Sequence, residues 1–402
     1  MAKKTSLPPP ISKRNLLWFS WKLVIALSIS LCVLALLRLQ HYSQSQLSFP
    51  SSSSSLVVRR SRILNSQFEG PPKVAFLFLT RRNLPLDVLW GCFFENADVG
   101  NFSIYIHSEP GFVFDESTTR SAFFYNRQLT NMIKVAWGEA SMIQAERLLL
   151  GAALEDPANQ RFVLLSDSCV PLYNFSYIYN NLMASPRSFV DSFLDEKEGR
   201  YNPTMSPVIP KNKWRKGSQW VSLVRGHAEI VVDDEVIFPV FKKFCKRRPP
   251  LDASKESKIL LRSVTQGRVT HLVEKLQKQH NCIPDEHYVQ TLLAMSDLEG
   301  ELERRTVTYT LWNHSATNME RKGWHPITFS YANAGPQQIK RIKDITQVYY
   351  ETEQRTEWCS NNSTRVPCFL FGRKFSKEAA VRLVSEGVVG PFNASVLLET
   401  PL

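Results

Sequence analysis

The sequence of 402 residues has no Cys-x-x-Cys pair, no cluster of histidines and no internal repeat. Metal binding is therefore the weaker use of its cysteines, because zinc sites combine closely spaced cysteine and histidine ligands. Long hydrophobic runs are also scarce. Only residues 16–37 are apolar over a length that crosses a bilayer. We expect one membrane span, followed by one large globular part.

Residues 16–37 predict a transmembrane signal anchor. Roughly 22 residues at a rise of 1.5 Å each span about 33 Å, which suits a thin Golgi-type membrane. Basic residues precede the run, so the positive-inside rule places the tail, residues 1–15, in the cytosol and the remaining chain in the lumen. A cleaved signal peptide is the alternative, but no small-x-small cleavage site follows the run. The expectation is a single-pass type II protein of the Golgi membrane.

The formal net charge of +12 limits the partners that the globular part can have. Nucleic acid would fit such a charge, but a lumenal protein does not meet it. Anionic membranes, acidic polysaccharides or the diphosphate of a nucleotide sugar remain. We therefore expect no nucleic-acid partner.

Cysteines and sequons agree with a lumenal location. Six of the seven cysteines lie after the predicted span, where an oxidising lumen favours disulfides. Cys359 and Cys368 flank a short polar loop and are the pair we expect to be bridged. Predicted N-glycosylation sites are Asn101, Asn174, Asn313, Asn361 and Asn393, with Asn361 overlapping a second sequon at Asn362.

The pattern of hydrophobic residues divides the rest of the chain. Residues 38–70 are Ser-rich without a periodic apolar face and predict a stem, and residues 71–402 predict the globular lumenal domain. Its first half predicts strand, helix, strand, helix and strand at residues 73–80, 86–96, 102–107, 142–154 and 161–166, with Glu146 and Arg147 facing outward from the second helix. In the second half we expect strands at 220–224 and 307–311 and helices at 233–244 and 286–295.

This alternation is typical of an α/β fold with a parallel-rich central sheet flanked by helices. Ligands of such sheets bind beyond the carboxyl ends of the strands, here near Thr80, His107 and Asp167. Asp233 and Asp234 directly precede an apolar helix, where acidic residues stabilise a helix start.

Several segments together resemble the core-2/I-branching β-1,6-N-acetylglucosaminyltransferases and their plant, brittle-culm-type relatives. The resemblance covers roughly residues 73–375, and the segments are Ile-Tyr-Ile-His at 104–107, Trp-Gly-Glu-Ala-Ser at 137–141, Leu-Leu-Ser-Asp-Ser-Cys at 164–169, Gly-Ser-Gln-Trp at 217–220, Pro-Asp-Glu-His at 284–287 and the segments around 359–365 and 368–375. The resemblance implies a type II Golgi glycosyltransferase with a GT-A-like nucleotide-binding fold. It also implies inverting chemistry without a divalent metal or another cofactor.

Inverting transfer needs one carboxylate that takes the proton of the attacking hydroxyl. The resemblance assigns this role to Glu286, while Asp285 is expected to cap the helix that follows. A pair of acids that merely stabilises the helix start is the alternative.

The departing diphosphate needs positive charge. A metal-binding Asp-x-Asp segment is missing after the third strand, where only Asp167 stands, so we expect no metal. By resemblance, Arg365 and Lys374 hold the diphosphate. The connection before Lys374 is shorter than in the animal enzymes, so Arg373 is an alternative.

The remaining site candidates rest on weaker signals. His107 and Asp167 are candidates for binding the donor, although either could be a structural residue. Lys216 and Trp220 belong to a basic, aromatic stretch that could bind an acceptor glycan, because sugar rings stack on indoles. Cys169 follows a buried strand and is expected to remain a free thiol.

The expected function is transfer of N-acetylglucosamine from a UDP-sugar to a polysaccharide or glycoprotein acceptor. UDP-glucuronic acid remains open as the donor. A catalytically silent lumenal protein that binds or scaffolds glycans is the alternative from another functional class. A hydrolase with two carboxylates is disfavoured, because no second acid in a convincing context accompanies Glu286.

Overall fold

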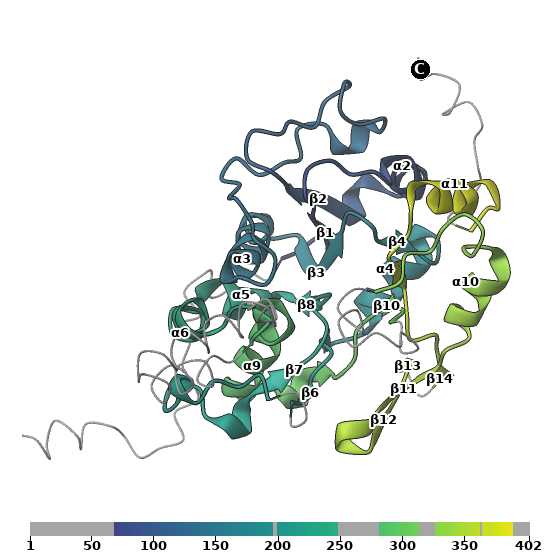
Figure 1. The fold of residues 1–402 in the computed structure, drawn as a ribbon. Helices are drawn as coiled ribbons and strands as arrows, with labels where there is room; N and C mark the ends of the chain where they lie inside the picture. The colour runs from purple at the N-terminus through teal and green to yellow at the C-terminus, as the bar shows by residue number, and fades with distance from the viewer. Residues whose placement is uncertain (1–67, 196–198, 248–280, 313–325, 362–363, 389–402) are drawn as a thin grey trace, which may run out of the picture. The chain divides into compact units, whose positions relative to one another are not determined.

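A six-stranded sheet lies at the centre of the part of the chain that the structure describes (Figure 1). This computed structural model describes residues 68–195, 199–247, 281–312, 326–361 and 364–388, all within one compact unit, Leu56–Leu402. The strand order is β2 (Phe102–His107), β1 (Lys73–Leu79), β3 (Asn159–Ser166), β8 (Ser222–Val224), β5 (Ser188–Phe189) and β9 (Leu302–Glu303). Strand β1 runs parallel to both of its neighbours, whereas β8 is antiparallel to β3 and β5. The fold is therefore mixed α/β, and the predicted parallel arrangement is confirmed for β2, β1 and β3.

Strand β1 is buried on both faces, as its continuous apolar sequence predicts. Val74, Phe76 and Phe78 belong to one hydrophobic core, and the intervening residues 75, 77 and 79 belong to a second core on the opposite face. This division follows from the alternation of side chains along a strand. Both faces of the sheet must therefore be covered by other elements.

Helices supply that cover on each face (Figure 1). The core that contains Phe76 includes side chains from α2 (Asp87–Glu95), α4 (Phe175–Ala184), α10 (Pro336–Lys343) and α11 (Lys377–Ser385). The other core includes side chains from α3 (Ala140–Leu154), α5 (Arg225–Asp233), α6 (Ile237–Phe244) and α9 (Tyr288–Met295). The central sheet is thus packed between two helical layers.

Short strands and single turns complete the described part. A three-stranded sheet consists of β10 (Thr308–Thr310), β15 (Phe371–Arg373) and β4 (Val170–Pro171). Two-stranded pairs are β6 (Phe193–Leu194) with β7 (Arg215–Lys216), β11 (Gln347–Tyr350) with β12 (Arg355–Trp358), and β13 (Ser360–Asn361) with β14 (Thr364–Arg365). The 3-10 helices are η1 (Val99–Asn101), η2 (Ala122–Phe124), η3 (Pro203–Met205), η4 (Lys211–Lys213), η5 (Pro284–Glu286), η6 (Glu299–Glu301) and η7 (Glu351–Glu353).

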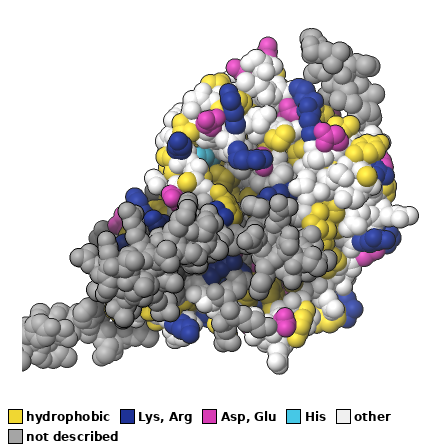
Figure 2. Space-filling model, viewed as in Figure 1, with side chains coloured by type: hydrophobic (Ala, Val, Ile, Leu, Met, Phe, Trp, Pro, Cys, Tyr) yellow, Lys and Arg dark blue, Asp and Glu magenta, His cyan; other side chains and the backbone are white. Residues whose placement is uncertain are grey.

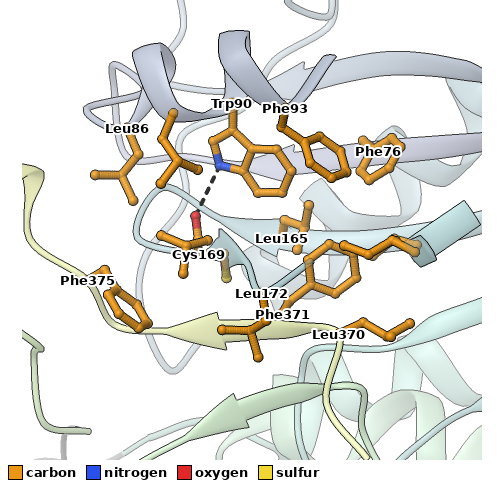
Figure 3. Packing of buried hydrophobic residues seen from close by; sticks show 14 of the residues in the cluster. Phe76, Leu86, Trp90, Phe93, Leu165, Cys169, Leu172, Leu370, Phe371 and Phe375 are labelled. Carbon is orange, nitrogen blue, oxygen red and sulfur yellow. Dashed lines mark hydrogen bonds between the residues drawn. The ribbon is translucent and has the colours of Figure 1, made fainter. Parts of the chain in front are cut away.

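Trp90 ties helix α2 to the turn that follows β3 (Figure 3). Its indole Nε1–H donates a hydrogen bond to the carbonyl oxygen of Cys169 at 3.0 Å. The indole ring also packs edge-on against Phe78, with the ring centroids 5.0 Å apart. This turn begins at Asp167, so the hydrophobic core holds Asp167 in place at the carboxyl end of β3.

Three local expectations need correction. Glu146 does not face outward, because it is only 4% exposed. Asp285 does not cap α9, which has no side-chain cap. The helix expected at 233–244 begins only at residue 237, as α6, because Asp233 ends α5, and Asp234 accepts the backbone N–H groups of residues 236, 237 and 238 at the start of α6.

The described residues contain no helix that is both long enough and apolar enough to span a bilayer. The predicted anchor and residues 38–67 of the predicted stem lie outside the described part.

Candidate active site

A cleft of about 1570 Å³ opens at the carboxyl ends of the first three strands. Thr80 follows β1, His107 ends β2 and Asp167 follows β3, and all three line the cleft. The cleft therefore lies where the strand pattern led us to expect ligand binding. Lys and Arg side chains surround a hollow on the face that Figure 2 shows.

The structure brings most of the predicted site residues to this cleft. Its lining includes Glu286, Lys374, His107, Asp167, Lys216 and Trp220, although Trp220 is only 5% exposed. Arg365 does not belong to the lining. It lies on β14, where its guanidinium stacks over the ring of Trp358 at 4.4 Å.

Glu286 is held at the end of the 3-10 turn η5. Its carboxylate oxygen Oε2 accepts a hydrogen bond from Nη1 of Arg200 at 2.5 Å, and its backbone carbonyl accepts the N–H of Gly217 at 2.9 Å. A Cβ atom at position 217 would collide with the carbonyl oxygen of Asp191. Glycine is therefore required at this position if η5 is to be held against the neighbouring loop.

His287 directly follows η5 and is packed as a neutral side chain. Its ring stacks on Trp214 with 4.5 Å between centroids, and its Nδ1–H donates to the carbonyl oxygen of Arg215 at 2.7 Å. Complete burial lowers the pKa of His287 well below its ordinary value. His287 therefore serves packing and does not supply a charge.

Two adjacent cations, Arg373 and Lys374, line the cleft at the end of β15. Arg373 is partly buried, its guanidinium lies 4.3 Å from the centroid of Trp220, and its Nε has no hydrogen-bond partner among the described residues. Lys374 is half-buried, and burial together with Arg373 lowers its pKa. The positive charges of Arg373 and Lys374 on the wall of one cleft are suited to an anionic ligand.

His107 and Asp167 differ in their surroundings. The ring nitrogen Nε2 of His107 accepts the backbone N–H of Ile133 at 3.1 Å, so the proton of the neutral ring is on Nδ1. Burial lowers the pKa of His107 to about 4. Asp167 accepts a hydrogen bond from Nε of the exposed Arg81 at 3.0 Å.

Sequence reasoning missed Asp191, Tyr350 and Arg200, all of which line the cleft. Asp191 accepts hydrogen bonds from the hydroxyl of Tyr350 and from the backbone N–H of Ser218, the latter at 2.9 Å. Burial raises the pKa of Asp191. Asp191 follows a short apolar segment much as Asp167 follows β3, and that signal could have identified it.

The cysteine and sequon expectations meet the structure in part. Cys359 and Cys368 form a disulfide with 5.2 Å between their Cα atoms, and Cys245 pairs with Cys282, a bridge that sequence reasoning did not assign. Cys169 is a buried free thiol. Among the sequon residues, Asn174 is exposed at the start of α4, Asn101 ends η1, Asn361 ends β13, and Asn313 and Asn393 lie outside the described residues.

Comparison with known proteins identifies the family. The family model described as core-2/I-branching enzyme matches residues 74–343. This chain belongs to the core-2/I-branching enzyme family. A rice protein (Oryza sativa subsp. japonica) named Glycosyltransferase BC10 is 52% identical to the chain over 329 residues, which cover 82% of this chain and 80% of the rice protein. The resemblance stated from the sequence motifs is therefore confirmed at the level of the family.

The range of this chain that the family model matches, 74–343, contains Glu286 but ends before Arg373 and Lys374. Within the described residues, no group of three or more His, Cys, Asp or Glu side chains is arranged to hold a metal ion.

Proposed function

We propose that this protein is an inverting glycosyltransferase that moves a sugar from a UDP-sugar to a glycan or glycoprotein in the Golgi lumen. The observation that carries the proposal is that Glu286 shares one cleft with Arg373 and Lys374. Family membership and the name of the rice relative support the reaction class. The Golgi location rests on the anchor predicted at residues 16–37.

Glu286 is the general base in this proposal. Arg200 holds Oε2 of the carboxylate, so Oε1 is the oxygen that we assign to the acceptor hydroxyl. As the hydroxyl oxygen attacks the anomeric carbon, its proton passes to Glu286 and the bond from the sugar to the diphosphate breaks on the opposite face. General-base catalysis of this kind contributes about 10²- to 10⁴-fold to a rate.

Arg373 and Lys374 stabilise the departing diphosphate. Fixed cations beside developing negative charge gain strength where protein excludes water. Arg373 meets this condition because it is partly buried on the wall of the cleft, with its guanidinium packed over Trp220. We assign the role to this pair, which lies in the cleft, and keep Arg365 as a prediction from the resemblance. A divalent metal is not required in this proposal.

The donor that we propose is UDP-N-acetylglucosamine, by resemblance to the family, with UDP-glucuronic acid as the competing donor. Lys216 and Trp220 border the same cleft and are proposed to contact the acceptor. A screen of UDP-sugars against the purified protein identifies the donor.

The decisive experiment measures sugar transfer in excess chelator by the native protein and by Glu286→Gln. We expect native activity to survive chelation and Glu286→Gln to lower kcat by about 10²- to 10⁴-fold, with UDP binding retained. Glu95→Gln is the matched control, because Glu95 is exposed at the end of α2 and does not line the cleft.

Each other outcome points elsewhere. Activity that requires manganese contradicts the metal-independent mechanism. Calorimetry that detects no UDP binding by the native protein favours the alternative of a catalytically silent scaffold.

A further inference from the structure

Two buried carboxyl groups have no role in the mechanism above, one in the turn η5 and one on helix α3. Glu146 on α3 is 4% exposed and Asp285 in η5 is 6% exposed. Helix α3 packs against η5. Oε1 of Glu146 accepts a hydrogen bond from Nε2 of Gln219 at 2.7 Å, whereas Oδ1 of Asp285 has no partner among the described residues.

The two groups cannot both be ionised at low energetic cost. Burial disfavours the charged form of a carboxyl group, and two like charges close together disfavour it further. Burial first, and then Asp285, raise the pKa of Glu146 well above its ordinary value. Burial first, and then Glu286, raise the pKa of Asp285 to about 7. The pKa of about 7 makes Asp285 the member whose charge changes near neutral pH, while burial and Asp285 favour the neutral form of Glu146.

Asp285 lines the same cleft as Arg373 and Arg200. Arg373 on β15 and Arg200 in the loop before η3 favour its ionised form, while its neighbour Glu286 opposes it. His287, on the other side of Asp285 in the chain, is neutral. The positive charge of Lys216 on β7 adds to the effect of burial in lowering the pKa of His287. Because Asp285 lines the cleft, its charge is felt where Arg373 meets a ligand.

We propose that Asp285, with Glu146 as its neutral buried partner, sets the net charge of the cleft wall and thereby controls how tightly Arg373 and Lys374 hold the diphosphate of a nucleotide sugar. Ionised Asp285 offsets the charge of Arg373 and weakens diphosphate binding. Protonated Asp285 leaves that charge uncompensated and strengthens binding. The inference rests on the proposed function, because it assumes that a nucleotide sugar occupies this cleft.

The experiment titrates the purified full chain with UDP-N-acetylglucosamine at pH 6 and pH 8, in chelator and without acceptor. The donor is used in place of UDP because its diphosphate is a diester and does not change charge in this range. For the native protein we expect Kd to rise by about tenfold from pH 6 to pH 8, because one buried charge near the ligand changes. A Kd that does not rise overturns the inference.

Two variants locate the charge. Asp285→Asn should bind equally at both pH values, apart from any part due to Lys374, with a Kd near the native value at pH 6. Glu146→Gln imitates the protonated acid and retains an acceptor for Gln219, so it should keep the native pH dependence. A pH dependence in Asp285→Asn as large as that of the native protein, or its disappearance in Glu146→Gln, overturns the assignment.

A measurement on the native protein alone covers the case in which Asp285→Asn does not fold. Titrations at pH 7 in two buffers of different ionisation enthalpy report the protons exchanged on binding. We expect uptake of a fraction of one proton for each donor bound, and zero uptake or release contradicts the inference. Absence of donor binding at either pH would instead contradict the proposed function, so the two failures are distinct.

Discussion

The two halves of the central sheet contribute to the cleft in different ways. Strands β1, β2 and β3 are six to eight residues long and pair along their length, with one shift of register between residues 73 and 74 of β1, and they bring polar residues to the cleft at their carboxyl ends. Strands β8, β5 and β9 are only two or three residues long. With this half we group two segments outside the central sheet that carry charged groups of the cleft, the turn η5 with Glu286 and strand β15 with Arg373. The regular half provides a rigid platform, and the irregular half provides the groups to which we assign the chemistry.

The sharpest test of the regular half is Phe76→Ala. Phe76 is fully buried on β1 and contacts the rings of Trp90, Phe93 and Phe94. Removing a buried aromatic ring leaves a cavity, so we expect a loss of about 3–5 kcal/mol in the free energy of unfolding. Urea denaturation measures it, with Val99→Ala as the control because Val99 is 73% exposed. A loss below about 1 kcal/mol would mean that β1 is not the centre of the platform.

The irregular half is tested by Arg373→Met, which removes the charge and keeps much of the side-chain volume. We expect kcat/KM for the donor to fall by about 10²- to 10³-fold, as when one preorganised electrostatic contact to the transition state is lost. The free energy of unfolding should fall less than it does for Phe76→Ala. Arg365→Ala is the comparison variant, and because Arg365 stacks on Trp358 outside the cleft lining we expect a fall below tenfold. A larger fall for Arg365→Ala than for Arg373→Met would return the diphosphate role to Arg365.

The same contrast separates what the sequence reveals from what it does not. Apolar runs predict β1, β2 and β3 within two residues, and for β1 and β3 the reason is that a strand buried on both faces needs such a run. Glu146 was misplaced because helical spacing alone cannot show that a carboxyl group is buried against η5. Asp191 was missed because the strand before it, β5, has only two residues, so the apolar segment that could have identified it is short. The Cys245–Cys282 bridge joins residues 37 positions apart, and no local pattern specifies such a pair.

His107 tests the regular half through pH. The pKa of His107 in the folded protein, about 4, lies below the ordinary value of 6.5. Between these two pH values the unfolded chain therefore binds a proton at His107 and the folded protein does not. The contribution of His107 to stability is therefore present above about pH 6.5 and is lost as the pH falls through 4. We expect His107→Gln, which offers an oxygen to the N–H of Ile133, to lose less stability than the native protein between pH 6.5 and pH 4.5. Chemical denaturation at the two pH values measures this, and an equal loss would argue against a buried neutral His107.

The smallest effect is expected for Arg81→Ala at the rim of the cleft. Arg81 pairs with Asp167 at 3.0 Å, but its side chain is 91% exposed. Water and salt screen such pairs, which contribute about 0–1 kcal/mol. We therefore expect the free energy of unfolding to fall by no more than about 1 kcal/mol and the donor KM to stay within about fivefold of the native value. Asp167→Asn is the matched variant, because Asp167 is only 13% exposed and its negative charge favours the charged forms of Arg373 and Lys374. Steady-state kinetics at low and high salt compare the two. If Arg81→Ala raises KM more than Asp167→Asn does, the rim of the platform binds the donor directly, and the division of roles between the two halves of the sheet does not hold.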